Sequence, residues 1–304
     1  MQTSLTDPIG GLRRIEQIHA LAEAELKGQA PDFDAPALLA ELDDLAQKPR
    51  TVTELEARIM VQYIGRLRPA RARILMNSLR EERTKEGDPD AFVQFEAMIK
   101  TALGRGAVIG HDFQPDAFQD RDHQAIWDDV RNVVRSLERW STNIFLNSGT
   151  LLGVVRDRKL IDHDDDVDLG MLIEARTERE AGRIWAQICG EMDAAGLLAD
   201  YDPAAMAQVK LNTSTGLALD LFPAWTFRGQ VYVFPHTYGE LSEDDVLPLQ
   251  PCELSGMQLP ARPERMLAVN YGDGWREPDP YFVFPWKRRK RQFRKFQRAC
   301  GVEE

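Results

Sequence analysis

The sequence contains few cysteines, no long apolar run and fewer basic than acidic residues. Cys189, Cys252 and Cys300 are far apart and form no Cys-x-x-Cys pair, which argues against a zinc finger or a disulfide framework. No apolar stretch approaches the roughly 20 residues that span a bilayer. The N-terminus also lacks the basic region and apolar run of a signal peptide. We therefore expect a cytoplasmic protein.

The balance of charge is acidic, with 38 Lys and Arg against 49 Asp and Glu and a formal net charge of −11. A nucleic-acid-binding protein needs a basic footprint, so we expect no nucleic-acid partner. The 304 residues are 43% hydrophobic and 29% charged, an ordinary composition for a globular protein with a buried core. That length suits one large domain or two ordinary ones.

Residues 1–104 are expected to form an all-helical domain. Apolar residues recur at helical spacing in two sets, Leu12, Ile15, Ile18 and Leu21, and then Leu38, Leu39, Leu42 and Leu45. Thr53 followed by Glu56 predicts a capping box. The region has no cluster of histidine, cysteine or carboxylate residues. Both an accessory packing domain and a docking module for a partner protein remain open.

Residues 105–121 contain several glycines and a proline, which predicts a linker. Residues 122–285 predict an α+β domain, because helical and strand patterns follow one another without regular βαβ repetition. The expected elements are helices near 126–137 and 174–195 and strands at 144–146, 209–211, 217–222 and 231–234. We expect a mixed sheet flanked by helices, followed by a separate basic segment at 286–304.

Residues 162–168 read Asp-His-Asp-Asp-Asp-Val-Asp, the most unusual stretch of the chain. Crowded carboxylates raise one another's pKa unless a cation neutralises them. The acids continue directly into the alternation of Val167, Leu169 and Met171, which indicates a buried strand, whereas the alternative is a solvated acidic loop. We predict a metal site here and assign no role to His163.

Side chains two residues apart in a strand project from one face, as do those of Asp166 and Asp168. Asp164 joins them if the strand begins early, and Asp220 lies in another predicted strand without a local basic partner. Such carboxylates suit Mg²⁺ or Mn²⁺, which bridge to substrate phosphates and stabilise displacement at phosphorus. The alternative for Asp220 is a structural acid that is hydrogen-bonded in the core.

A turn of small residues, Ser148, Gly149 and Thr150, precedes the acids. Backbone N–H groups and hydroxyls in such a turn can bind phosphate oxygens, so these residues are candidate donor contacts. Arg156 is a further candidate, because a guanidinium binds phosphate with two hydrogen bonds. The alternative for Arg156 is to balance the charge of the acids.

These motifs, taken in order, resemble the LicD family, which includes bacterial phosphocholine transferases and the fukutin-related proteins. The resemblance covers roughly residues 122–285. It rests on the segment from Gly149 to Arg156, on Asp164-Asp165-Asp166-Val167-Asp168, on Leu219-Asp220-Leu221-Phe222-Pro223, and on Tyr271-Gly272-Asp273 with Trp275 and Pro278. The family usually has Pro-Trp where this chain has Asp162-His163, so the transferred group is left open.

The resemblance implies a nucleotidyltransferase-type fold and a defined reaction. A phosphorylated polyol or phosphocholine-type group would move from a CDP-activated donor to a sugar hydroxyl, with release of CMP. Asp164, Asp166 and Asp168 would bind the metal, and Asp220 would bind metal or take the proton of the acceptor. Two alternatives are transfer of the nucleotide itself and a non-catalytic scaffold that binds glycans or membranes.

Residues 286–298, from Trp286 to Arg298, carry eight basic residues with Phe293 and Phe296 interleaved. A solvated final helix is one interpretation. The other is attraction to an anionic membrane surface or an anionic glycan acceptor. Capsule or other surface-polysaccharide synthesis, with lipid-linked saccharide acceptors at the inner face of the membrane, would use such a segment.

Overall fold

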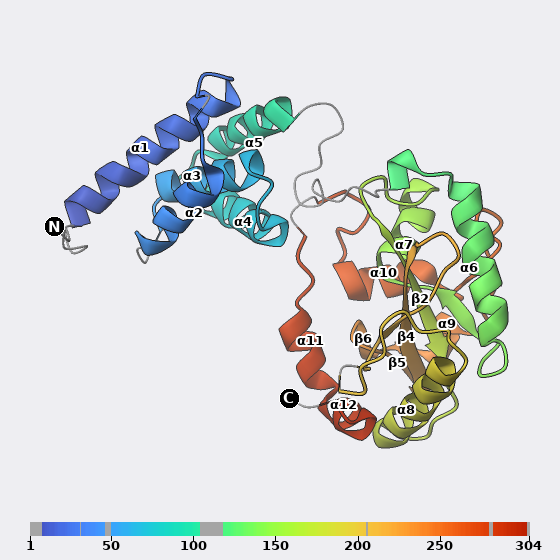
Figure 1. Cartoon of the computed structure of the whole chain (residues 1–304). Helices are drawn as coiled ribbons and strands as arrows, with labels where there is room; N and C mark the ends of the chain where they lie inside the picture. Colours follow the sequence, from blue (N-terminus) through green and yellow to red (C-terminus); the bar gives the residue numbers. More distant parts are fainter. Residues whose placement is uncertain are drawn as a thin grey trace. The chain divides into compact units, whose positions relative to one another are not determined.

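The computed structural model describes residues 8–30, 32–45, 50–103, 118–204, 206–279 and 282–302. The chain divides into two compact units, the first comprising residues 1–114 with 280–283 and the second residues 115–279 with 284–304 (Figure 1). Each unit has its own hydrophobic core.

The described part of the first unit is helical, as expected. Its helices are α1 (Pro8–Leu26), α2 (Ala35–Asp44), α3 (Val52–Ile64), α4 (Pro69–Lys85) and α5 (Pro89–Leu103). Helix α3 contacts each of the other four helices, and its residues from Glu54 to Tyr63 are all buried. Helix α4 begins at Pro69, where the missing backbone N–H of proline costs no hydrogen bond.

The predicted helices are present, but the buried face of α1 is narrower than the apolar pattern, and the predicted cap of α3 is wrong. Leu12 and Leu21 are 38% and 39% exposed, whereas Ile15, Ile18 and Ala22 are buried. A strict three-residue spacing drifts by about 60° per step around an α-helix, so the ends of that set leave the buried face. The cap of α3 is Thr51, whose hydroxyl accepts the Glu54 N–H at 3.1 Å, and not the predicted Thr53.

The second unit is built on a mixed six-stranded sheet, which confirms the predicted α+β class. Its strands are β1 (Ile144–Leu146), β2 (Asp166–Leu172), β3 (Val209–Lys210), β4 (Ala218–Phe227), β5 (Gln230–Val233) and β6 (Thr237–Ser242). The order is β1-β2-β4-β5-β6, with β3 also paired to β4. Only the β2–β4 pair is parallel among these described strands. Strands β7 (Gln250–Pro251) and β8 (Gln258–Leu259) form a separate antiparallel pair.

Helices surround this sheet (Figure 1). They are α6 (His123–Leu137), α7 (Ser148–Leu152), α8 (Glu178–Ala194), α9 (Glu243–Val246), α10 (Pro263–Tyr271), α11 (Trp286–Gln292) and α12 (Arg294–Cys300), with a π-helical turn at Gly153–Asp157. Helices α8 and α12 pack side by side. A Cβ at Gly182 of α8 would lie 2.5 Å from the carbonyl oxygen of Phe296, so this close packing requires glycine. No helix among the described residues is long and apolar enough to cross a bilayer.

Two predicted segment boundaries differ from the structure. Residues 105–117 of the predicted linker lie outside the described residues, but Phe118 is buried, and its N–H donates to the Asp164 carbonyl at 2.8 Å. Residues 118–121 therefore belong to the second unit. The basic segment at 286–304 is also part of this unit, because Phe293 and Phe296 are buried in its core.

Candidate metal and phosphate site

Three carboxylates converge where the parallel strands β2 and β4 begin. Asp166 and Asp168 lie on one face of β2, and the register places Asp220 of β4 opposite Asp168. One carboxylate oxygen from each of the three acids lies within 4.8 Å of the others. Asp168 and Asp220 are each only 8% exposed. Buried carboxylates this close together must be either protonated or neutralised by a bound cation.

Asp164 lies in a second acidic group. Strand β2 begins at Asp166, so Asp164 precedes it, and the early start that would have placed Asp164 on the face of Asp166 and Asp168 does not occur. Asp164, Asp165 and Asp166 each offer an oxygen within 4.8 Å of the others. Asp166 thus belongs to both groups, and Asp164 and Asp165 complete the second.

The environment favours the protonated form of these acids. Burial, followed by the charge of Asp166, raises the pKa of both Asp164 and Asp168 well above the usual range. Burial also raises the pKa of Asp166, with Asp165 as the next cause. For Asp220, burial followed by the charge of Asp166 raises the pKa to about 6. A cation bound among the acids would reverse this preference.

The first turn of α7 holds Asp168 in position. The Gly149 N–H donates to Asp168 Oδ2 at 3.1 Å, and the Asp168 N–H donates to Thr150 Oγ1 at 2.9 Å. A Cβ at Gly149 would lie 2.8 Å from Asp164 Oδ2 and 3.7 Å from Asp168 Oδ2. Glycine is required here because any side chain would enter the acidic group.

His236 is a site-bordering residue that the sequence did not reveal. Its Nε2 lies 2.8 Å from Ser148 Oγ, and its Nδ1 lies 3.3 Å from Asn147 Nδ2. Burial, followed by the charge of Arg289, lowers the pKa of His236 to about 3, so the imidazole is neutral at physiological pH. Ser148 is held in a left-handed conformation, with φ of +43°. Because His236 is 88 residues from Ser148 and belongs to no motif, the sequence did not indicate this contact.

Arg156, a predicted phosphate contact, pairs with the neighbouring Asp157 and not with an acid of the two acidic groups. Its Nε and Nη2 donate to Asp157 Oδ1 and Oδ2 at 2.9 and 2.7 Å. Tyr271 at the end of α10 also borders the acids: burial, followed by the charge of Asp168, raises the pKa of its hydroxyl well above the usual value.

Residues 141–263 match the family model described as LicD/FKTN/FKRP, nucleotidyltransferase domain. This part of the chain is a LicD-family domain. The matched range contains β1, α7, β2 and β4, and therefore all of the converging acids. Membership of this family supports a transferase of the phosphotransferase type that modifies glycans. A search of curated proteins found no match to the chain.

Lys210 is a second residue of the LicD-family domain that the sequence analysis missed. It lies on β3 directly opposite Asp220, and cross-strand partners project from the same face of a sheet. The exposed Lys210 side chain is close enough that its charge opposes the rise in pKa that burial causes in Asp166 and Asp220. The signal was available, because antiparallel pairing of the predicted strands at 209–211 and 217–222 brings Lys210 close to Asp220.

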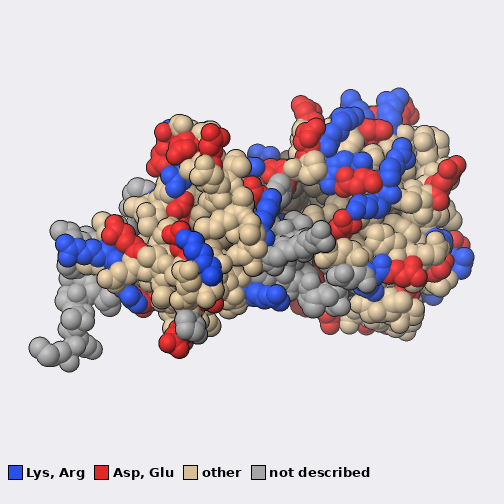
Figure 2. Space-filling view, turned by 90° about the horizontal axis from the view of Figure 1, so that it is seen from above, with Lys and Arg blue, Asp and Glu red and all other residues tan. Residues whose placement is uncertain are grey.

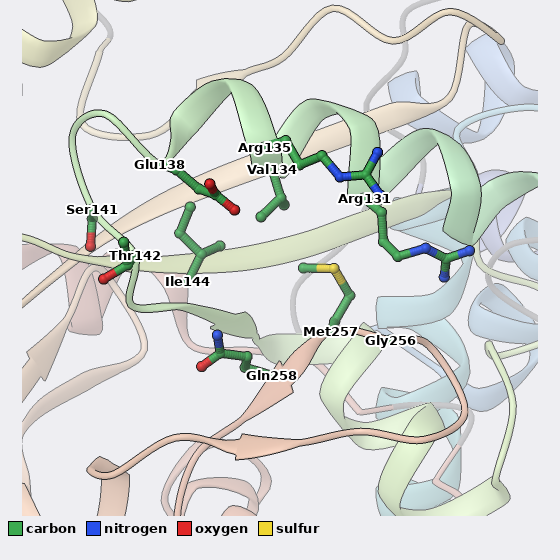
Figure 3. A pocket seen from close by; sticks show the side chains of 10 residues that line it. All are labelled: Arg131, Val134, Arg135, Glu138, Ser141, Thr142, Ile144, Gly256, Met257 and Gln258. Carbon is green, nitrogen blue, oxygen red and sulfur yellow. The ribbon is translucent and has the colours of Figure 1, made fainter.

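Two cavities of the second unit lie apart from the acids. One of about 220 Å³ lies between α6 and the β7–β8 pair, and Figure 3 shows Arg131 and Arg135 above Met257 and Gln258. Arg131 Nη1 already donates to the Ser255 carbonyl at 2.6 Å. The other cavity, of about 390 Å³, is lined by aromatic residues of β4, β5 and β6 with Thr177, Glu178, Arg179 and Lys295. No residue of the two acidic groups lines either cavity. The candidate site is therefore defined by the convergence of the carboxylates and not by a cavity.

Proposed function

We propose that the LicD-family domain is a metal-dependent transferase that moves a phosphorylated group onto a glycan. The convergence of Asp166, Asp168 and Asp220 within 4.8 Å carries this proposal. Such a carboxylate set is suited to hold a divalent cation against a phosphate while one oxygen displaces another at phosphorus. The same convergence argues against a non-catalytic scaffold, which has no use for crowded buried acids.

The carboxylates fit Mg²⁺ or Mn²⁺. Both ions prefer hard oxygen ligands and retain open positions for substrate phosphate. Asp220 Oδ1 is buried and has no hydrogen-bond partner among the described residues, so a ligand position is open there. We assign Asp166, Asp168 and Asp220 as the metal ligands, with Asp164 beside them. The bound ion would neutralise the acids and the phosphates of the donor.

The other residues take roles that follow from their contacts. Gly149 and Thr150, predicted as phosphate contacts, position Asp168 by hydrogen bonds. Ser148 is held by His236, and Arg156 by Asp157. Lys210 is the cation that faces the acid group, and we assign it to a phosphate of the donor.

The donor and acceptor classes follow from the family resemblance. We propose a CDP-activated donor, transfer of a phosphorylated polyol or phosphocholine-type group to a sugar hydroxyl, and release of CMP. Asp220 would take the acceptor proton in the alternative arrangement, in which the other acids hold the metal and its own carboxylate faces the acceptor hydroxyl. A pH–rate profile of Asp220→Asn with saturating Mg²⁺ separates that role from metal binding.

The test is metal-dependent CMP release by the full chain from CDP-ribitol, CDP-glycerol and CDP-choline with a glycan acceptor. We expect Asp168→Asn to abolish release while the thermal unfolding transition is kept. Asp162→Asn is the matched control, because Asp162 pairs with Lys159 at 2.6 Å and belongs to neither acidic group. Full turnover by Asp168→Asn would overturn the proposal.

Labelled donor separates the two transfer reactions. A label on the α-phosphate remains on CMP if the phosphorylated group is transferred. The same label appears on the acceptor if the nucleotide itself is transferred, and that outcome would replace the proposed reaction with nucleotidyl transfer.

A further inference from the structure

Helices α11 and α12 display a concentrated positive charge. Residues 286–298 contain eight basic residues and no acidic one, in a chain of net charge −11. All of them except Arg289 are exposed. Five form what we call the basic surface: Lys287, Arg288, Lys290, Arg291 and Lys295. By contrast, Lys and Arg lie among Asp and Glu on the face of the molecule shown in Figure 2.

Both helices are fixed to the core of the second unit. Phe293 and Phe296 are fully buried, and Phe296 stacks on Trp225 with ring centroids 5.1 Å apart. The Phe296 N–H donates to Glu178 Oε1 at 3.3 Å. Isolated helices of this length do not persist in water, so the basic surface owes its geometry to these contacts. The final segment is therefore a pair of helices anchored to the core, and not the single solvated helix of the first interpretation.

Arg289 differs from the other basic residues of α11 because its charge is paired within the fold. It is the one basic residue of α11 that is largely covered, and it pairs with Glu240 and donates to the Val269 carbonyl at 3.1 Å. Its charge is satisfied within the fold. The remaining four cations of α11 are exposed to solvent and available to an external anion.

An aromatic residue stands at the start of this surface. Trp286 is 41% exposed, and the Lys290 ammonium lies 5.4 Å from the centre of its ring. A half-exposed indole beside cations is typical of proteins that bind the headgroup region of a membrane. A soluble polyanion would engage the cations but leave the indole in water.

The basic surface also begins close to the candidate site. The rings of Trp286 and His236 have centroids 5.8 Å apart, and His236 Nε2 lies 2.8 Å from Ser148 Oγ. Ser148 precedes Gly149, whose N–H holds Asp168. A surface bound at Trp286 would therefore lie near the acidic group.

We propose that α11 and α12 bind the surface of an anionic phospholipid bilayer, with the cations of the basic surface on lipid phosphates and the Trp286 indole among the headgroups. The domain would then act on acceptors held at that bilayer. Binding to the bilayer does not depend on the catalytic proposal, whereas action on acceptors held there rests on it.

The test is sedimentation of the full chain with vesicles of phosphatidylcholine alone or with added phosphatidylglycerol. We expect binding only to the anionic vesicles, weakened by salt. The combined variant Lys287→Gln, Arg288→Gln, Lys290→Gln and Arg291→Gln should bind at least about tenfold more weakly, because each basic residue near the membrane adds to the attraction. Trp286→Ala should also weaken binding.

The matched control removes four exposed arginines that lie outside α8, α11 and α12, by Arg13→Gln, Arg66→Gln, Arg71→Gln and Arg139→Gln. This control should bind as the native chain does. Equal loss in both variants would overturn the proposal, since it would show only a net-charge effect. Binding to soluble polyphosphate that is indifferent to Trp286→Ala would also overturn it in favour of a polyanion site. Asp168→Asn should keep vesicle binding, which separates this test from that of catalysis.

Discussion

Asp168 and Asp220 stand opposite each other in the parallel register of β2 and β4, and both are almost fully buried. Neighbouring strands are about 4.8 Å apart, so two carboxylates on one face in this relation cannot avoid each other. The hydrogen bonds between β2 and β4 therefore hold the two carboxylates close together. A divalent cation bound between the two carboxylates would remove their mutual repulsion.

Gly149→Ala should impair metal binding without unfolding the domain. The new methyl group would lie 2.8 Å from Asp164 Oδ2, so the acid must move. Loss of such supporting geometry lowers metal affinity by roughly 10–100-fold. Isothermal titration with Mn²⁺ measures the change. The control is Gly190→Ala in α8, where the nearest atom is 3.8 Å away and no effect is expected.

Asp220→Asn and Asp129→Asn should change stability in opposite directions in metal-free protein. The neutral amide introduced by Asp220→Asn would relieve repulsion from Asp166, so the metal-free chain gains stability but loses stabilisation by Mg²⁺. Asp129 is also buried, yet hydrogen bonds from Thr215 and Ser214 outweigh burial and lower the pKa of its carboxyl. Its oxygens accept at 2.6–3.1 Å, and their disruption should cost about 1–3 kcal/mol. Urea unfolding in EDTA checks both signs.

The stability difference between metal-free native chain and metal-free Asp220→Asn should change in the direction of a less stable native chain as pH rises between about pH 4 and pH 6. The difference is the quantity to compare because His236, whose pKa is lowered to about 3, contributes the opposite slope to both chains. The folded-state pKa of Asp220 is raised to about 6 from 3.8, so folding favours its protonated form. That contribution is present below the unfolded pKa and is lost as pH rises through the folded pKa, a change of about 3 kcal/mol for Asp220 alone. Thermal unfolding in EDTA across this range measures the loss. Saturating Mg²⁺ should remove most of it, and an unchanged slope with Mg²⁺ would contradict metal binding by this group.

Lys210→Met should raise KM for the donor roughly tenfold or more, since a charge-assisted contact to phosphate is worth about 1.5–3 kcal/mol. Affinity for Mn²⁺ should be retained or increased, because a nearby positive charge is removed from the acids. Lys210→Arg should recover part of the donor affinity. Lys159→Met is the control, as Lys159 pairs with Asp162 outside the acidic groups. A parallel loss of metal affinity in Lys210→Met would show that Lys210 supports the fold of the site and not the donor.

The local features of this protein were predictable from its sequence. Alternation of Val167, Leu169 and Met171 with acids identified strand β2, because the two-residue period of a strand is a property of consecutive residues. The same reasoning put Asp166 and Asp168 on one face and found the helices α6 and α8. The order of the motifs along the chain was then enough to predict the LicD family, which the match over residues 141–263 supports.

Contacts between distant segments were decided only by the tertiary structure. The parallel register that sets Asp220 opposite Asp168 joins strands about fifty residues apart, and no local pattern specifies it. The Ser148–His236 contact and the burial of Phe293 and Phe296 beneath basic helices likewise depend on packing. Sequence thus determined which residues carry charge and which strands hold them. The fold decided which charges meet, because that depends on how the sheet brings its strands together.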